Sequence, residues 1–111
     1  MVNLDTDEGL VCGYYGALSI DGTVGGVSFP AGALIHATLK GRIRKIYGVL
    51  ETGQVRFTID GSTAPTNLIG TLLEVGQRLT LYDEETRDFK AIRTVATATG
   101  SLKYHVYYQV V

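Results

Sequence analysis

The chain has no tryptophan, one cysteine, one methionine and two prolines among its 111 residues. Because Cys12 has no second cysteine to pair with, the sequence excludes an internal disulfide bond and a cysteine-based zinc site. Its position in the apolar segment LVCGYYGAL favours a small buried hydrophobic side chain over a reactive thiol. We therefore expect a chain that folds without an oxidising compartment.

Long hydrophobic runs are also absent. The longest largely apolar segment, residues 10–20, is interrupted by glycines and is far shorter than the ~20 residues that span a bilayer. The first nine residues carry Asp5, Asp7 and Glu8, where a signal peptide needs basic residues. These features predict a soluble protein, made in the cytoplasm and without a membrane partner.

Charged residues are few and balanced. They make up 19% of the chain, and the formal net charge of −1 provides no general attraction to nucleic acid or to acidic membranes. The apolar fraction of 45% suits a globular protein and excludes a disordered one. The length predicts a single domain over residues 1–111, with residues 1–9 as an extended N-terminal arm.

Fourteen glycines punctuate the chain, and turn motifs recur about every eight to twelve residues, a spacing typical of β-sandwiches and barrels. The Asp-Gly pair within residues 17–29 predicts a hairpin with a type I′ turn. A stronger hairpin is predicted over residues 46–60, around a Thr-Gly pair. There Val55, Phe57 and Ile59 form an apolar face opposite polar residues, as a sheet with one packed face requires.

Three further segments read as strands. Pro30 and Gly32 interrupt the chain, and the side chains of residues 33–39 then alternate between two faces as in a strand. Residues 71–83 predict a short hairpin or a bulged pair. Residues 101–111 predict a long closing strand. Residues 39–50 also have apolar side chains at helical spacing, but the glycines within this segment favour a strand.

One short helix is predicted near residues 83–94. Asp83 is a suitable N-cap, acidic residues follow it in the first turn, and basic residues come later. Phe89 and Ile92 would then face the sheet. The sequence thus predicts an all-β fold: an antiparallel β-sandwich of about eight strands, jelly-roll or Ig-like, with this one helix.

Residues suited to catalysis are scarce. His36 and His105 are the only side chains that normally titrate near neutral pH, and neither lies in a catalytic or metal-binding motif. The acidic run at residues 83–85 suits a helix start better than a calcium site. Residues 21–26 are glycine-rich but lack the Lys-Ser/Thr of a phosphate-binding loop. We therefore predict no catalytic residue, no metal site and no cofactor, and hence no enzyme.

The candidate contact residues fall in two segments. The basic segment KGRIRK is either a solvated turn or a contact for an acidic protein partner, and it lacks the interleaved aromatic side chains that nucleic-acid binding favours. The tyrosines of the closing strand cover both of its faces, so at least one should lie outside the core. Cross-strand packing, a protein contact surface and a sugar platform remain alternatives for them. The candidate interface residues are Arg42, Arg44, Lys45, Tyr104, Tyr107 and Tyr108.

Four blocks follow one another in the C-terminal half: VRFTIDGSTAPT (55–66), GQRLTL (76–81), FKAIR (89–93) and LKYHVYY (102–108). In this order they resemble a group of small β-sandwich proteins from the structural gene modules of tailed bacteriophages. Those proteins share such a strand and Asp-Gly turn, a G-x-x-L-x-L strand, an F-(K/R)-A-I-R segment and a closing L-x-V-x-Y strand. The closing block departs slightly, with Tyr104 in its register, and the N-terminal half resembles no family that we can name.

The resemblance implies a virion structural protein, made in the host cytoplasm. The role it suggests is capsid decoration (cement), in which the protein binds the assembled head and bridges subunits of the major capsid protein, or binds other virion proteins. A head–tail or tail accessory role, and a carbohydrate-binding module that uses the closing tyrosines, are the alternatives. Self-association is expected, with a trimer favoured, and the expected contacts lie in residues 2–10, residues 40–45 and the terminal strand.

Overall fold

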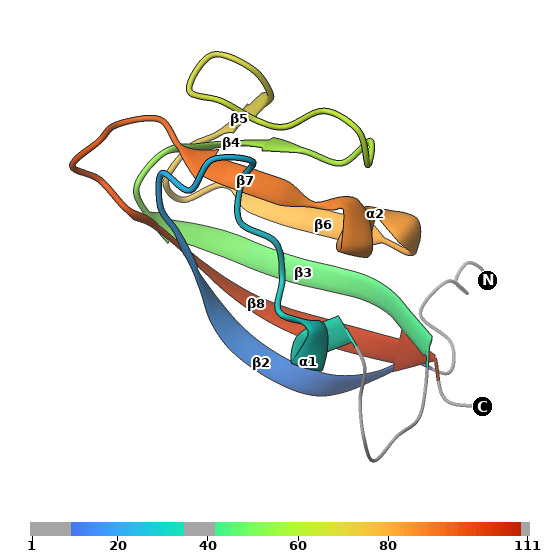
Figure 1. Cartoon of the computed structure of the whole chain (residues 1–111). Helices are drawn as coiled ribbons and strands as arrows, with labels where there is room; N and C mark the ends of the chain where they lie inside the picture. Colours follow the sequence, from blue (N-terminus) through green and yellow to red (C-terminus); the bar gives the residue numbers. More distant parts are fainter. Residues whose placement is uncertain (1–9, 35–41, 110–111) are drawn as a thin grey trace.

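The computed structural model describes residues 10–34 and 42–109, which form two antiparallel β-sheets packed as a sandwich (Figure 1). The four-stranded sheet contains, in spatial order, β2 (Leu10–Ile20), β8 (Gly100–Gln109), β3 (Arg42–Thr52) and β6 (Arg78–Tyr82). The three-stranded sheet contains, in spatial order, β5 (Thr71–Leu73), β4 (Val55–Thr58) and β7 (Lys90–Arg93). Two short helices, α1 (Ala31–Leu34) and α2 (Glu84–Asp88), complete the described chain. The predicted all-β sandwich is confirmed.

The core lies between the two sheets and is rich in aromatic rings. The ring of Phe89 is stacked against Phe29, with centroids 4.8 Å apart, and against Phe57, with centroids 5.7 Å apart. The rings of Tyr104 and Phe29 pack edge to face, with centroids 4.7 Å apart. The cluster therefore joins β8 to the three-stranded sheet. Such contacts stabilise the fold beyond the burial of apolar area alone. Aromatic packing therefore holds the two layers together.

The predicted hairpin over residues 46–60 is wrong in its pairing, although both of its strands exist. β3 pairs with β8 and β6, whereas β4 pairs with β5 and β7, so the Thr-Gly turn carries the chain from one sheet to the other. Gly53 has a φ of 69°, and a Cβ there would lie 2.6 Å from the carbonyl oxygen of Thr99. The chain needs a glycine here because this turn between the sheets has a left-handed backbone and passes close to the backbone of Thr99.

The predicted pair within residues 71–83 shows the same difference. β5 and β6 are both present, but they belong to different sheets. A turn in which Gln77 N donates to Glu74 O at 3.0 Å joins them, and Gly76 N donates to Leu50 O at 2.7 Å, which ties this turn to β3. Local alternation located the strands, but it carried no information about which sheet each would join.

The hairpin predicted around the Asp-Gly pair does not form. β2 ends at Ile20, and its partner is β8. The chain then crosses to the other layer, where Val27 forms an isolated bridge with Ala91 through hydrogen bonds of 2.7 and 3.0 Å. This bridge covers part of the free edge of β7, so the segment serves as a crossover rather than as a return strand.

The helix predicted near residues 83–94 covers only Glu84–Asp88. Asp83 occupies the N-cap position but has a φ of 49° and forms no side-chain capping hydrogen bond. Phe89 has an extended backbone, and the residues after it pair with β4 as β7. Pairing with β4 and burial of Ala91 outweigh the helical propensity of this segment. Phe89 is buried as predicted, whereas Ile92 is a strand residue on the outer side of β7.

Two other predictions fall partly or wholly outside the described residues. The strand predicted over residues 33–39 begins in α1, so its first two residues are helical, and the remainder lies outside the described part of the chain. The arm expected at residues 1–9 and the side chain of His36 also lie outside it. The strand favoured over residues 39–50 is present from Arg42 as β3, and the closing strand predicted over residues 101–111 is present up to Gln109 as β8.

The crossing at Gly53 generates a stability prediction. Gly53→Ala forces a left-handed backbone on an alanine next to a carbonyl oxygen, so we expect the free energy of unfolding to fall by at least about 1–2 kcal/mol in urea denaturation. Gly32→Ala is the matched control, since a Cβ at that helical position meets open space, and it should be neutral or slightly stabilising. Equal midpoints for the two variants would contradict this account of the crossing.

Candidate functional site

The side of the four-stranded sheet that faces away from the core is the first candidate contact surface. Residues directly opposite each other in a sheet share a face, so the strand register defines which side chains lie together. Three rows cross β2, β8, β3 and β6 on this side, and we call them the outer face. The rows are Cys12, Tyr107, Lys45 and Tyr82; Tyr15, His105, Tyr47 and Thr80; and Ala17, Lys103, Val49 and Arg78.

Aromatic rings occupy the middle of the outer face. Tyr15 is 56% exposed, and its ring lies against the His105 ring with the centroids 5.0 Å apart. Tyr47 stands opposite His105 on the other side. In the neighbouring row, the Lys45 Nζ lies 5.1 Å from the centroid of the Tyr107 ring, a favourable position for a cation. The outer face therefore combines ring surface, hydroxyl groups and cations.

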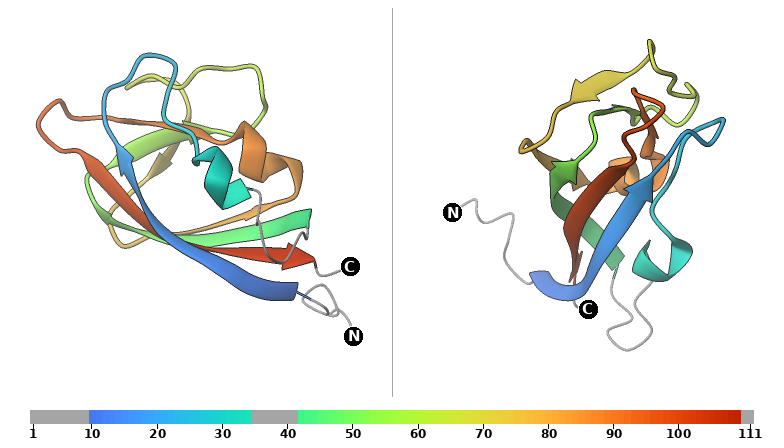
Figure 2. Two further views of the ribbon diagram at one scale, coloured as in Figure 1. Left: turned by 60° about the horizontal axis from the view of Figure 1, so that its bottom comes forward. Right: turned by 90° about the vertical axis from the view of Figure 1, so that its left-hand side faces the viewer.

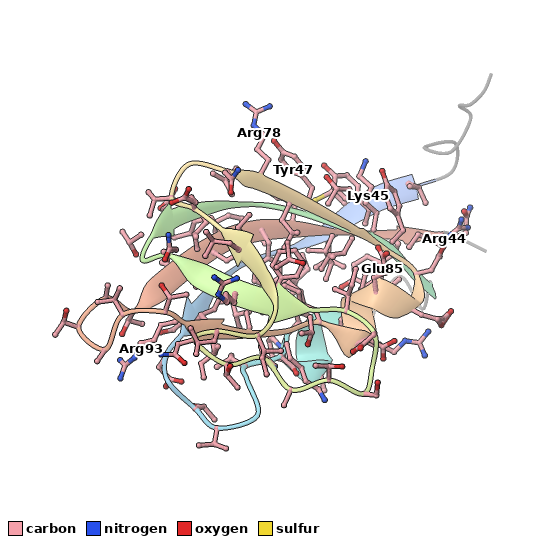
Figure 3. All side chains as sticks on the ribbon, turned by 90° about the horizontal axis from the view of Figure 1, so that it is seen from above. Arg44, Lys45, Tyr47, Arg78, Glu85 and Arg93 are labelled. Carbon is pink, nitrogen blue, oxygen red and sulfur yellow. The ribbon has the colours of Figure 1, made fainter. Side chains whose placement is uncertain are left out.

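Basic side chains outnumber acidic ones on this surface. It carries Lys45, Arg78 and Lys103. At the end of the face, Lys103 Nζ forms an ion pair with Glu51 Oε1 at 3.1 Å. The hydrogen bond and charge of Glu51 raise the pKa of the Lys103 ammonium, which therefore stays protonated. In Figure 3, Lys45, Tyr47 and Arg78 project from the same side of the ribbon. The outer face is thus locally positive on a chain whose formal net charge is −1.

Of the three tyrosines predicted as contact residues, only Tyr107 lies on the outer face. The prediction is wrong for Tyr104 and Tyr108, which are 2% and 0% exposed because alternate residues of β8 point into the core. Burial raises the pKa of both phenols. The Tyr108 hydroxyl donates a hydrogen bond of 2.5 Å to the carbonyl oxygen of Ala33 and so ties β8 to α1.

The basic residues predicted as contacts also lie in different environments. Lys45 lies on the outer face, whereas Arg44 occupies a bulge of β3. Arg44 Nε pairs with Asp83 Oδ1 at 2.8 Å, and Nη1 donates to Gln109 Oε1 at 3.2 Å, so this side chain links β3 to the start of α2 and to the end of β8. Arg42 opens β3 opposite Gln109. Arg44 therefore has a structural role, and Lys45 stays a candidate contact residue.

Sequence reasoning missed most of the outer face. Tyr15, Tyr47 and Arg78 come from three different strands, and no motif links them. The alternation within residues 43–49 could have identified Lys45 and Tyr47 as neighbours on one side of a strand. Cys12, predicted to be buried, is exposed, because a bulge between Cys12 and Tyr14 turns it to the side of Tyr107.

A second surface lies on the other layer of the sandwich. Leu68 and Ile69 are 81% and 50% exposed, and Leu72 of β5 is also exposed. Leu72 faces away from the core, because its neighbour Leu73 is buried opposite Val55. We call Leu68, Ile69 and Leu72 the apolar loop. Figure 2 shows β5 and the loops beside it at the end of the molecule away from β2 and β8.

Hydrogen bonds hold the apolar loop in one shape. The Thr66 hydroxyl accepts hydrogen bonds from Leu68 N at 3.1 Å and from Ile69 N at 3.0 Å. Arg56 of β4 donates to the carbonyl oxygens of Asn67 at 3.2 Å and of Gly70 at 2.9 Å. A loop this well tied loses little conformational entropy when it binds a partner. These exposed aliphatic side chains, held on one well-tied loop, make the apolar loop the second candidate contact surface.

Within residues 10–34 and 42–109, no group of three or more His, Cys, Asp or Glu side chains is placed to hold a metal ion. In the same part of the chain, no helix is long and apolar enough to cross a membrane. Comparisons of the chain with protein-family models, with curated proteins and with solved structures found no match. The two exposed surfaces are therefore the features on which a functional argument rests.

The division of the closing tyrosines between core and surface is testable. Tyr108→Phe leaves the Ala33 carbonyl without its donor, so we expect a loss of about 1–3 kcal/mol in the free energy of unfolding. Tyr107→Phe, on the outer face, should change it by no more than about 0.5 kcal/mol. Urea denaturation of the two variants measures both values, and an equal effect would contradict the assignment of the two faces.

The buried Tyr108 also predicts that the protein loses stability at alkaline pH. Because folding raises the pKa of Tyr108, its neutral form stabilises the native state, fully so below the unfolded-state pKa of about 10. Stability should therefore fall as the pH rises above about 10, and part of this fall should be absent in Tyr108→Phe. Urea denaturation curves of the wild type and Tyr108→Phe, measured from pH 8 upward at steps of about half a pH unit, would test this pH dependence.

Proposed function

We propose that this chain is a virion structural protein of a tailed bacteriophage, in the role of a capsid decoration (cement) protein. It binds the assembled head and bridges neighbouring capsid subunits. The observation that carries the proposal is the presence of two exposed surfaces, the outer face and the apolar loop, on opposite layers of one sandwich. A bridging protein needs two such surfaces held at a constant distance, and a core packed through aromatic rings provides that stiffness.

The positions of the four phage-like blocks support this role. They fall on β4 with its following turn, on β6, on β7 and on β8, and so contribute strands to both sheets. The outer face takes Tyr15, Lys45 and Tyr47 from the N-terminal half, which resembles no family. A shared framework in which the unshared half supplies half of the outer face suits a structural protein adapted to one particular shell.

A cement protein does not need high affinity in each copy. A protein that binds only the assembled shell shifts the assembly equilibrium towards it, and many copies add their contributions. Self-association, with a trimer at threefold positions as the proposed form, would add multivalency. A head–tail or tail accessory role is the alternative within the same class of protein, and it differs in the number of copies per particle.

A carbohydrate-binding module is the second candidate function. The exposed ring of Tyr15 beside His105, on the outer face of the sheet, is the observation that favours it, since sugar rings pack on aromatic side chains. It requires binding on a glycan array that Tyr15→Ala abolishes. An array without binding at high protein concentration would remove this candidate.

Purified particles of the virus that encodes the chain test the proposal directly. Quantitative mass spectrometry should find the protein on the order of hundreds of copies per particle, whereas a ring of about six or twelve would indicate a neck or tail role. Particles without the protein should release their DNA at a lower temperature than complete ones. An unchanged rupture temperature, or absence of the protein from particles, would contradict cementing.

The apolar loop provides a matched pair of variants for the same particles. Leu68→Ser removes a side chain that is 81% exposed, so it should leave the fold intact but fail to restore the rupture temperature when added back. Val24→Ser, at a position that is 97% exposed in the crossover segment, should restore it fully. Equal restoration by both would remove the apolar loop as a contact.

A further inference from the structure

We infer that the outer face binds a carboxylate-rich protein surface. This inference rests on the proposed function, under which the acidic surface belongs to the assembled capsid. It extends that function by naming the chemistry of the partner and the side chains that recognise it. Three properties of the outer face carry it: its charge, the state of its rings and its dimensions.

The charge and the donors of the outer face match carboxylates. Lys45 and Arg78 lie on neighbouring strands, in rows that bracket Tyr47. Arginine and lysine form charge-assisted hydrogen bonds with carboxylates, and tyrosine hydroxyls donate to the same groups. Tyrosine and arginine are also the side chains enriched at the centres of protein interfaces. An acidic protein surface therefore finds both ionic and hydrogen-bonding partners across the whole face.

The state of the rings disfavours single-stranded nucleic acid, the other anionic partner of an aromatic and basic sheet. Base stacking needs ring faces that are open to solvent. Lys45 lies over the ring of Tyr107, which is therefore not open for stacking on that side. At the end of the face, Lys103 already forms an ion pair with Glu51. With a net charge of −1 the chain provides no long-range attraction to a phosphate backbone, on which nucleic-acid binding largely depends, whereas a protein interface needs only short-range contacts.

The dimensions of the outer face set the strength of binding. Four strands about 4.8 Å apart give a width of roughly 15–20 Å, and three rows extend it by about 14 Å along the strands. This area is smaller than the ~800 Å² per partner of a standard stable interface. A single copy should thus bind weakly and reversibly, and strong attachment requires many copies or the second surface.

Charge-reversal variants test the inference on capsids that lack the protein. Binding of the purified chain is measured by co-sedimentation. We expect Lys45→Glu and Arg78→Glu each to weaken binding on the order of tenfold, and added salt to weaken the wild type. Arg93→Glu is the matched control, because Arg93 lies on the other side of the ribbon in Figure 3 and should bind as the wild type does. Lys45→Gln and Arg78→Gln should show smaller losses of the same order if either reversal variant unfolds.

The outcomes separate the inference from the proposed function. Wild-type binding with undiminished binding by both outer-face variants overturns the inference and leaves the decoration role intact. Absence of wild-type binding to any capsid overturns the decoration role. The chemistry of the face then still has its own test, which needs no capsid.

Nuclear magnetic resonance titrations provide that independent test. Poly-L-glutamate and a single-stranded oligo-dT are added separately to the isotope-labelled chain. The inference requires poly-L-glutamate to shift the amide resonances of Lys45, Tyr47, Arg78 and Tyr107, with weaker effects from oligo-dT. Tighter binding of oligo-dT at these residues would assign the face to nucleic acid and overturn the inference, and the absence of shifts with poly-L-glutamate would do the same.

Discussion

The structure depends on one strand, β8, and on the two-residue period of its side chains. β8 lies between β2 and β3 and pairs with both along nearly its whole length. Its inward residues, from Leu102 to Tyr108, are buried against the other layer, and its outward residues Lys103, His105 and Tyr107 form the centre of the outer face. A shift of register by one residue would exchange these two sets. Burial of the inner set therefore also determines which groups the protein presents to a partner.

The two layers are joined at points where the chain crosses between them. The Thr52-Gly53 turn, the turn before β6 and the bridge from Val27 to Ala91 each connect one sheet to the other. Between these points the rings of Phe29 and Phe89 fill the interior. Dense packing of this kind has low compressibility, so the outer face and the apolar loop keep a nearly constant separation. A protein that bridges two neighbours depends on that property more than on the affinity of either contact.

Structural and contact roles are divided among residues of the same type. Arg44 and Arg56 use their guanidinium groups within the protein, on Asp83 and on the carbonyls of the apolar loop, whereas Arg78 lies on the outer face. Tyr108 is likewise internal, while Tyr107 is half-buried at the surface. Composition alone therefore overstates the contact surface. The proposed contact surface comes from a few side chains that the sheet holds side by side.

The sequence by itself determined the β-rich fold and most strand positions, because alternation and turn residues act over a few neighbouring positions. It also singled out Lys45 and Tyr107, which the strand register places opposite each other on the outer face. Only the tertiary structure decided that β3 and β4 belong to different sheets, that residues 90–93 form a strand, and that Tyr104 lies in the core. The physical reason is that strand pairing and burial are settled between segments far apart in the chain. The outer face shows this most clearly, since it unites Tyr15, Tyr47 and Arg78 only through hydrogen-bonded register.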